Sequence, residues 1–444
     1  MPEPLAIPQG GLENGQLPAD WQLVRLGDVA SLASGGTPSK TRPEFWDGSI
    51  PWASPKDLKQ PFLFDAEDHI SEAGLEDGSR LVQPGTLFLV VRGMILARDL
   101  PVSMAMVPMA FNQDMKAVIP GPKVDGRYLL YAFQHHKSSL VPEIGTSAHG
   151  TRRISTSAVE NFTLPLPPLS EQGAIAQILD RVHLAKEATE KTITAASQLK
   201  SSLVRYLLTF GPVPVGEADH VQLKETEIGS LPEHWSVSRL VDLLRERLRN
   251  GHSAKATNTD SGVRTLTLTA VTQNDFSIKN TKLTHADPDK VRGIWLKPGD
   301  ILVERANTPE YVGLAALYEG PDDFAIYPDL MVRVRLKEKE ILPKYAAEFL
   351  LTEPCRRYYR SNAKATAGNF PKIDHQVIES TLIPLPPLDE QREIAAALGA
   401  MDEKIRTEEV RREALSSLFS TLLHVLMCGR LRAGNFQVVG SSGG

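Results

Sequence analysis

The feature that most constrains the fold of this chain is an internal repeat. Three segments of the first half return in the same order in the second half: Leu17–Trp21 as Leu231–Trp235, Pro84-Gly85 as Pro298-Gly299, and Leu164–Gln172 as Ile383–Gln391. The first two segments return at one and the same offset and the third at a slightly larger offset, so the small insertions between them belong in loops. A chain repeated in this way is expected to form two similar halves.

Each half begins with a mixed segment, residues 17–163 and then residues 215–382. Short apolar runs between turn signals predict strands, and longer apolar stretches predict helices. The predicted strands are Thr86–Val91, Ala117–Ile119, Ile301–Val303 and Met331–Leu336, the last alternating like a half-buried strand, and the predicted helices are Tyr128–Phe133 and Tyr345–Leu351. This pattern is typical of an α/β (α+β) domain, with a strand order that the sequence does not determine.

Each half ends in a predicted long helix. A proline-rich segment that cannot be helical precedes it, and Ser170 or Asp389 then offers an N-cap oxygen, followed by a glutamate in the first turn. Apolar residues recur every three or four positions from Ile175 to Tyr206 and, with interruptions, from Ile394 to Leu426. This spacing is that of a coiled-coil seam.

Neither helix has an obvious globular core to lie on, so we expect the two helices to pack against each other. One alternative is that each amphipathic helix covers its own domain. The proline-rich segments could also be polyproline ligands, but both directly precede a helix and fit rigid hinges better.

Composition indicates a globular protein, with 41% hydrophobic and 23% charged residues. No apolar run is long enough to span a membrane, and the N-terminal segment 1–16 does not resemble a signal peptide. Cys355 and Cys428 are the only cysteines and lie far apart without CxxC spacing. This argues against a disulfide framework or a zinc site and favours a reducing cytoplasm.

The sequence contains no recognisable catalytic motif. It has no methyltransferase cofactor loop or Asn-Pro-Pro-Tyr-type tetrad, no phosphate-binding loop and no Gly-x-Ser-x-Gly elbow. His69 and the pair His135-His136 lack partners at metal-ligand spacing, so we interpret them as surface or core histidines. We therefore expect neither a catalytic centre nor a metal.

Several segments together resemble one known family. The similarity is to the target recognition domains and helices of type I restriction-modification specificity subunits, and it extends over nearly the whole chain from residue 17. The segments in the first half are Ser34–Ser39, Phe45-Trp46, Ile50–Trp52, Pro55–Leu58 and Ile154–Ile175, and those in the second half are Lys297–Leu302, Val312-Gly313 and Ile383–Gln391. The second half departs from the pattern at Arg249–Ser253, which replaces the Gly-Gly-Thr-Pro opening, so its contact residues cannot be aligned with those of the first half.

The resemblance implies two target recognition domains separated by two long helices that form an antiparallel coiled coil. The implied parts are a flexible tail at 1–16, recognition domains at 17–163 and 215–382, proline-rich lead-ins with spacer helices at 164–214 and 383–432, and a C-terminal tail at 433–444. A duplicated chain of this kind has approximate two-fold symmetry, which suits two copies of one partner.

The resemblance also implies a function and partners. Each recognition domain would read one half of a bipartite target in double-stranded DNA, and the stiff helices would fix the separation of the two halves. Two methyltransferase (M) subunits carrying S-adenosylmethionine would methylate adenine. Two restriction (R) subunits using ATP and Mg would join them in the full complex, in a prokaryotic cytoplasm. This chain would itself be non-catalytic and hold no cofactor.

Base readout needs side-chain donors and acceptors on exposed loops. The segments 145–153 and 364–372 are both small, polar and basic, and they are related by the offset of the third repeated segment. With the weaker candidates, the predicted DNA-binding residues are Ser39, Lys40, Arg42, Arg92, Thr146, His149, Thr151, Arg152, Arg153, Asn250, His252, Ser253, Lys255, Arg305, Asn307, Arg356, Arg357, Lys364, Thr366, Asn369 and Lys372. For Arg92 and Arg305 a buried ion pair is the alternative, and for Arg356 and Arg357 a solvated helix face with buried tyrosines.

The net charge of −5 does not by itself favour a DNA-binding protein. Either the basic residues cluster on one face or a partner supplies much of the affinity for the DNA backbone. A non-catalytic, repeat-built scaffold that joins two protein partners without reading DNA is therefore the alternative function.

Overall fold

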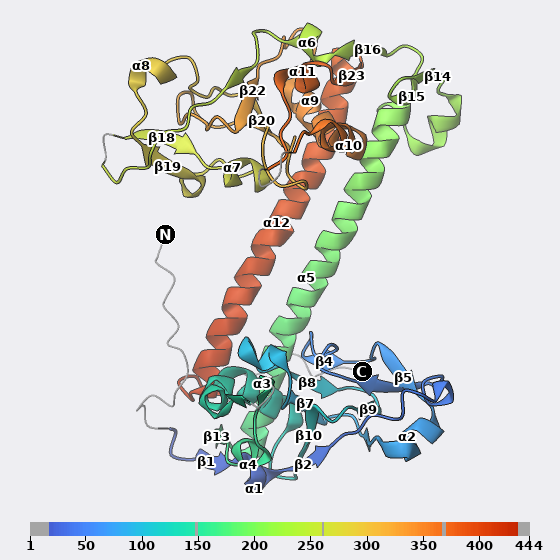
Figure 1. Cartoon of the computed structure of the whole chain (residues 1–444), viewed down its shortest axis with the longest axis vertical. Helices are drawn as coiled ribbons and strands as arrows, with labels where there is room; N and C mark the ends of the chain where they lie inside the picture. The colour runs from blue at the N-terminus through green and yellow to red at the C-terminus, as the bar shows by residue number, and fades with distance from the viewer. Residues whose placement is uncertain (1–16, 147–149, 260–261, 366–369, 434–444) are drawn as a thin grey trace, which may run out of the picture. The chain divides into compact units, whose positions relative to one another are not determined.

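The computed structural model describes residues 17–146, 150–259, 262–365 and 370–433. It divides into two compact units (Figure 1). The first unit combines the described residues up to Glu190 with those from Val410 onward, and the second is Lys191–Glu409. Each unit therefore holds one of the two mixed segments, here called the first and second domain, together with part of both long helices.

The first domain is built on a five-stranded sheet in the order β2-β10-β7-β8-β4. Its central strand is the apolar run Leu87–Val90 (β7), which is buried on both faces. The other strands are β2 Ala30–Ser34, β10 Met115–Pro120, β8 Val102–Ala105 and β4 Phe62–Leu63. Helix α3 (Gly126–His136) contacts β8 and β10 and buries most of its side chains in the same core.

A four-stranded sheet in the order β5-β3-β9-β6 completes the first domain. Its strands are β5 Asp68–Ile70, β3 Ile50–Ala53, β9 Met109–Phe111 and β6 Leu81–Val82. The smaller elements are β1 Gln22–Arg25, α1 Leu26–Val29, η1 Pro43–Phe45, α2 Glu72–Gly78, η2 Met94–Ala97, η3 Lys137–Glu143, β11 Gly145–Thr146, β12 Arg152–Arg153, α4 Thr156–Glu160 and β13 Thr163–Leu166. Strand β1 pairs with β13, so the two ends of the domain meet where the first long helix begins.

The second domain repeats the main sheet in the order β17-β22-β20-β21. These strands are β17 Arg249–Asn250, β22 Met331–Val334, β20 Ile301–Glu304 and β21 Ala315–Leu317. The other elements are η4 Val215–His220, β14 Leu223–Thr226, β15 Gly229–Pro232, β16 Ser236–Arg239, α6 Leu240–Leu243, β18 Val263–Leu266, α7 Thr269–Thr272, η5 Ile278–Asn280, β19 Thr281–Thr284, α8 Pro288–Val291, α9 Pro343–Leu350, α10 Glu353–Asn362, α11 His375–Glu379 and β23 Leu382–Leu385. Strand β16 pairs with β23 as β1 pairs with β13.

The predicted class, an α/β domain in each half, is confirmed. One detail of the strand prediction is wrong, because Met331–Val334 is buried on both faces rather than half-buried. The alternating polar position is Arg333, whose guanidinium is satisfied internally by Glu246 at 2.7 Å and by the carbonyls of Trp295 and Gly293. A charged residue in a strand pattern therefore did not mark a solvent face.

The repeated Pro-rich segment serves the same structural purpose in both halves. The Gln172 amide accepts from the backbone N–H of Asp125 at 2.8 Å and donates to the carbonyl of Pro167, and Gln391 does the same with Leu342 and Pro386. Both glutamines are buried, so their hydrogen bonds fix the angle at which each helix leaves its domain. Tyr128 and Tyr345 add a matched pair, donating to the carbonyls of Pro165 and Pro384.

The two opening tryptophans bind the first turns of the two helices. Trp21 Nε1 donates to Glu171 at 3.0 Å, and Trp235 Nε1 donates to Glu390 at 2.7 Å. Glu171 also accepts from Arg432 at 2.8 Å. Although burial acts to raise the pKa of Glu171, the hydrogen bonds from Arg432 and Trp21 hold this pKa below its usual value. The glutamate expected to complement the helix dipole therefore also anchors the helix start.

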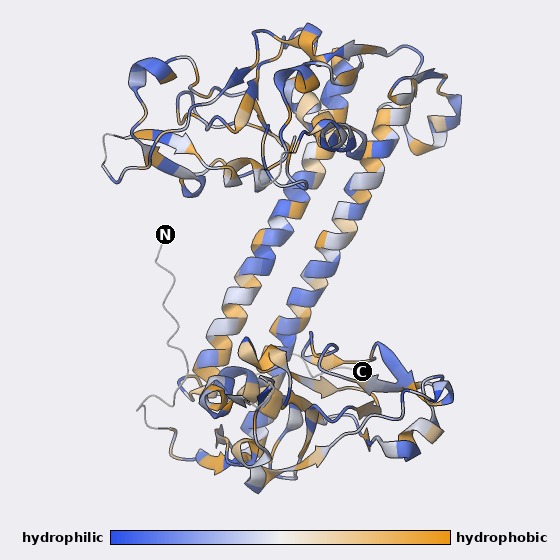
Figure 2. Ribbon diagram, viewed as in Figure 1, coloured by the Kyte–Doolittle hydropathy of each residue, from blue (hydrophilic) through white to orange (hydrophobic). Residues whose placement is uncertain are grey.

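The long helices are α5 (Leu169–Phe210) and α12 (Leu388–Met427). Both begin one residue before the predicted N-cap, because the backbone N–H groups of Glu171 and Gln391 bond to the carbonyls of Pro168 and Pro387. Ser170 and Asp389 are thus first-turn residues. Figure 2 shows hydrophobic residues recurring among hydrophilic ones along both helices.

The two helices pair antiparallel within each unit, as predicted. In the first unit His183 lies against Phe419, with ring centroids 6.4 Å apart, and Glu171 lies against Arg432. In the second unit Lys200 forms a 2.7 Å ion pair with Asp402. The expectation that neither helix has a core to lie on is wrong, since Ile175 and Leu179 are buried in the first core and Ile394 and Leu398 in the second.

No helix among the described residues combines the length and apolar character needed to cross a membrane.

Candidate nucleic-acid interface

In the first domain, the loop after β2 closes over a turn at residues 112–114. Gly36 donates its N–H to the carbonyl of Phe111 at 3.0 Å, and the Thr37 hydroxyl hydrogen-bonds to Gln113. Gly35 has no room for a side chain, because a Cβ there would lie 2.2 Å from the Phe111 carbonyl oxygen. The Gly-Gly-Thr-Pro motif is therefore a close backbone approach that positions the residues that follow it.

Two tryptophans, from the segments Phe45-Trp46 and Ile50–Trp52, hydrogen-bond to the backbone of this loop. Trp52 Nε1 donates to the carbonyl of Gly36 at 3.0 Å, and Trp46 Nε1 donates to the carbonyl of Ser39 at 3.1 Å. The two indoles pack edge to face, with centroids 5.0 Å apart. The buried Trp52 and the half-buried Trp46 thus hold the backbone of the loop that presents the exposed donors.

The predicted residues Ser39, Lys40 and Arg42 lie on this supported loop. The Ser39 N–H donates to Asp77 at 2.9 Å, and Lys40 is exposed. Arg42 is exposed too, but its Nε donates to Glu44 at 2.8 Å, so part of its charge is already compensated.

The predicted basic loop of the first domain forms a ribbon beside the end of β7. Strands β11 and β12 pair, and Arg153 forms a bridge with Arg92, while Gly93 donates its N–H to the carbonyl of Arg152. The Arg92 side chain is 57% exposed and lies 3.8 Å from Asp114, so the alternative of a buried ion pair is wrong for this residue. The fold thus brings together Arg92, Arg152 and Arg153, and within the described part of the chain neither Arg152 nor Arg153 forms an ion pair.

In the second domain, the loop after β17 occupies the equivalent place. His252 donates its N–H to the carbonyl of Tyr327 at 2.9 Å. A Cβ on Gly251 would lie 2.0 Å from that carbonyl oxygen, which is the constraint found at Gly35. The segment Arg249–Ser253, whose sequence differs from Ser34–Ser39, therefore takes the structural place of the first domain's Gly-Gly-Thr-Pro loop.

The other predicted residues of this loop form hydrogen bonds with neighbouring segments of the second domain. Asn250 Oδ1 lies 2.8 Å from His375 Nε2, and the Ser253 hydroxyl hydrogen-bonds to Asp329. Lys255 is exposed further along, where its carbonyl accepts from the N–H of His285.

The second basic segment pairs with the end of β20. Lys364 and Lys372 form a backbone pair, and Lys372 also bridges to Ala306. Ile373 donates its N–H to the carbonyl of Arg305 at 2.9 Å. Lys364 is 83% exposed and lies 3.5 Å from Asp374, while Lys372 is also exposed and has no ion pair among the described residues.

These contacts define which positions of the two domains correspond. Ile154 donates to the carbonyl of Val91 as Ile373 donates to that of Arg305, so Arg305 occupies the position of Val91 rather than that of Arg92. Arg305 is accordingly buried at its Nε, which has no hydrogen-bond partner in the described residues. By the same register Arg153 corresponds to Lys372, and both are cations at the surface of their domains.

Asn307 follows Arg305 and donates to the buried carboxyl of Glu304 at 2.5 Å. Burial raises the pKa of Glu304 to about 7, and the hydrogen bond from Asn307 opposes that rise. Asn307 is half-buried, so its amide is partly engaged inside the domain.

The sequence placed Arg356 among the DNA contacts, but the structure buries its side chain. Its guanidinium donates to the carbonyls of Val312 and Glu310 at 2.7 Å, and burial lowers its pKa. We therefore assign Arg356 a structural role and omit it from the interface. Arg357 is 73% exposed on the other face of α10, at 3.9 Å from Glu353, and Tyr359 is buried, as the alternative for this helix expected.

The remaining predicted residues belong to the two basic loops. Thr146 is exposed in β11, and Thr151 is half-buried just before β12. His149, Thr366 and Asn369 lie outside the described residues.

The sequence list missed Gln113 and His375, which contact Thr37 and Asn250 from neighbouring turns. The turn residues after β9 offered a weak signal for Gln113, and nothing local marked His375.

Comparison with known proteins decides the family. A family model described as "Type I restriction modification DNA specificity domain" matches residues 18–196 and 232–417, once in each half. The chain belongs to this family. The two matches cover both domains and most of both helices, so the repeat found in the sequence consists of two copies of the matched family domain.

Relatives in the family match to different extents. The chain is 32% identical over 183 residues to the EcoR124I/EcoR124II specificity subunit of Escherichia coli, covering 41% of this chain and 45% of that protein. It is 26% identical to the MjaVIII specificity subunit of Methanocaldococcus jannaschii, covering 95% of each protein. The second alignment spans both domains and both helices.

The fold of this chain is also that of a solved specificity subunit. The crystal structure of the type I restriction-modification S subunit from M. genitalium superposes with a TM-score of 0.62 at 14% identity, covering 93% of this chain and 97% of that one. A structure described as showing complex assembly and conformational transition of the type I R-M system superposes at 0.50, again at 14% identity, covering 94% and 100%.

Proposed function

We propose that each recognition domain of this specificity subunit reads one half of a bipartite DNA target. The loops after β2 and β17, together with the basic ribbons that end at Arg153 and Lys372, form the reading surface. The chain itself is non-catalytic and directs methylation by partner subunits. The boundaries 17–163 and 215–382 delimit the two readers.

The observation that carries this proposal is the equivalence of the two surfaces. Both domains place a close-packed glycine, Gly35 or Gly251, and a surface cation, Arg153 or Lys372, at the same end of the main sheet. Thr37 and Ser253 make matching hydrogen bonds, to Gln113 and Asp329, but other side chains differ, since Gly36 stands where the second domain has His252. A shared framework with different donors and acceptors is what two readers of different base sequences require.

The arrangement of charge supports DNA binding despite the net charge of −5. Arg152, Arg153 and Lys372 are free of ion pairs within the described residues, so they can neutralise phosphate without first losing a carboxylate.

The helices supply the second part of the proposal. Gln172 and Gln391 lock both helices to their domains in the same way, so the chain offers two similar docking surfaces. Two methyltransferase (M) subunits with S-adenosylmethionine dock on them and methylate adenine, and two restriction (R) subunits with ATP and Mg join the full complex. One solved relative is itself described in terms of assembly of the type I R-M system.

Exchange of one domain tests the two-reader proposal. The chain is co-expressed with its methyltransferase subunit, and residues 17–163 are replaced by the corresponding domain of a relative with a different target. We expect methylome sequencing to show adenine methylation at a split site in which only one half changes. Methylation of the unchanged site would contradict the proposal.

Charge reversal separates DNA reading from the alternative of a scaffold without DNA contact. We expect Arg152→Glu with Arg153→Glu, or Lys372→Glu alone, to reduce DNA affinity at least about ten-fold and to weaken its dependence on salt, because phosphate contacts are lost. Assembly with the methyltransferase, measured by analytical ultracentrifugation, should stay unchanged. Lys339→Glu, at an exposed position outside the proposed reading surface, is the matched control. Site-specific methylation that survives both reversals would favour the scaffold.

A further inference from the structure

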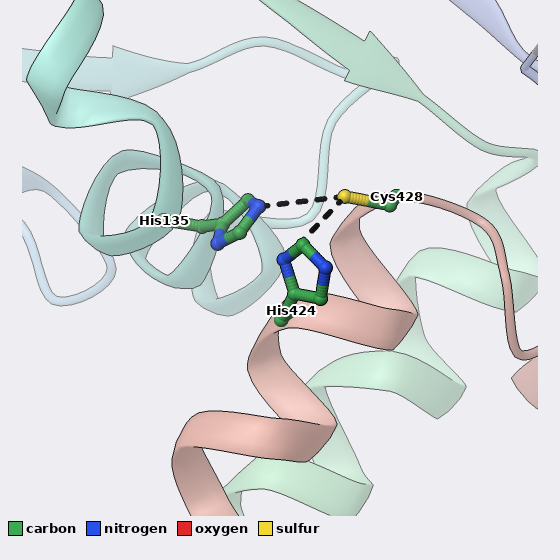
Figure 3. Close-up of side chains that lie close together, drawn as sticks. All are labelled: His135, His424 and Cys428. Atoms are coloured by element: carbon green, nitrogen blue, oxygen red, sulfur yellow. Dashed lines mark hydrogen bonds between the residues drawn. The ribbon is translucent and has the colours of Figure 1, made fainter. Parts of the chain in front are cut away.

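Three side chains with metal-binding atoms meet in the first unit, and none of them belongs to the proposed reading surface. His135 lies in the last turn of α3, and His424 and Cys428 lie at the end of α12 (Figure 3). Cys428 Sγ is 3.6 Å from His135 Nε2 and 3.8 Å from His424 Nδ1. The three ligand atoms all lie within 4.8 Å of one another. Figure 3 shows both imidazoles close to the sulfur.

This geometry fits a tetrahedral metal. Zn–N bonds of about 2.0–2.1 Å and a Zn–S bond of about 2.3 Å place tetrahedral ligand atoms roughly 3.3–3.7 Å apart. The two measured separations to sulfur are close to this range. Two imidazoles and a thiolate are borderline-soft donors that suit Zn²⁺ and not Mg²⁺ or Ca²⁺, which take oxygen ligands.

The internal repeat shows that the fold itself does not require these residues. Gly429 after α12 approaches Trp21, and Gly211 after α5 approaches Trp235, so the two glycines are equivalent. Counting back from them, His424 and Cys428 correspond to Tyr206 and Phe210. Those two rings pack against each other at 5.2 Å.

The third ligand position is equally asymmetric. Tyr128 of α3 corresponds to Tyr345 of α9, which places Thr352 at the position of His135. At these three equivalent positions the second unit therefore has two aromatic rings and a hydroxyl group, whereas the first unit has three metal-binding groups.

We propose that His135, His424 and Cys428 bind one Zn²⁺ through His135 Nε2, His424 Nδ1 and Cys428 Sγ, with water as the fourth ligand. Binding deprotonates the thiol, so one proton leaves for each Zn²⁺ bound. It also places the His424 proton on Nε2, which ends the 3.4 Å contact of that atom with Arg430. Arg430 is exposed and can turn toward solvent.

The site has a structural consequence for the first unit. His135 and Cys428 are 293 residues apart in the chain, and the unit is made of segments from both ends of the chain. A metal that joins α3 to the end of α12 closes this long loop and stabilises the discontinuous unit. The ligands are half-buried, which leaves a path for the ion to reach them.

Direct measurement on the full chain, without a histidine tag, tests the proposal. Equilibrium dialysis against Zn²⁺ followed by elemental analysis should give one ion per chain. Co²⁺ in its place should give the visible spectrum of a tetrahedral site with a thiolate charge-transfer band. Competition with a chromophoric chelator should show at least roughly 100-fold weaker affinity in Cys428→Ser and in His424→Tyr.

The repeat supplies variants designed to stay folded. The triple change His135→Thr, His424→Tyr and Cys428→Phe installs the residues of the other junction, and circular dichroism checks its fold. It should lose Zn²⁺ binding together with the rise in melting temperature that Zn²⁺ gives the native chain. Cys355→Ser is the control and should bind like the native chain. Absence of stoichiometric binding, or binding that persists in the triple variant, would overturn the proposal.

Discussion

Glu304 ends β20 with a fully buried side chain, and its Oε1 has no hydrogen-bond partner in the described residues. Burial raises its pKa from 4.5 to about 7. Between these two values the folded state holds a proton that the unfolded state releases, so stability falls as pH rises. Between pH 5 and pH 8 we expect the second unit to lose roughly 1–2 kcal/mol through this group, after allowance for solvent screening.

Glu304→Gln should remove this loss, because a neutral amide keeps a polar group beside Asn307 and cannot ionise. Urea unfolding at the two pH values, followed by hydrogen exchange of peptides across β20, measures the difference. Glu319→Gln, at an exposed position, is the matched control and should keep the native pH dependence. Equal pH dependence in the native chain and Glu304→Gln would contradict this assignment.

At the scale of elements, the sequence predicted what periodicity and repetition determine. The helices α3, α9, α5 and α12 were expected within a few residues of their observed bounds, since each has a continuous apolar pattern. The helix starts were misplaced by one residue because a proline carbonyl accepts the first bonds. The burial of Arg333 could not be foreseen, since it depends on Glu246, a partner 87 residues away.

The loops of the candidate interface could be predicted from the sequence, but the strands beside which they lie could not. The polar, basic character of residues 145–153 and 364–372 is visible in the sequence, whereas their pairing with the ends of β7 and β20 follows from sheet order. The cluster at Cys428 shows the same limit. Its spacing of four residues from His424, just past the end of α12, was a local signal, but His135 joins it only through the tertiary fold.

At the scale of the whole molecule, the first unit depends on both ends of the chain. Leu426, Met427 and Ala433 are buried in the core that the first domain forms, and Arg432 binds Asp20 and Glu171. The second unit contains all of its own residues in one continuous stretch, Lys191–Glu409. The two units should therefore respond differently to loss of the C-terminal part of α12.

A chain that stops at Glu409 removes this segment from the first unit and nothing from the second. Each buried Leu or Met side chain contributes about 1.5–3 kcal/mol, and loss of Arg432 also leaves the buried Glu171 without its cation, so the loss is comparable to the roughly 5–15 kcal/mol that stabilises a domain. Hydrogen exchange should show lost protection in α3 and β7 and native protection in β20 and β22. A chain that stops at Ala433 keeps these contacts and is the control. The contacts of Leu426 and Arg432 with the first unit come from this C-terminal segment. If α3 were as well protected in the shorter chain as in the control, the C-terminal segment would not be part of the first unit's core in solution.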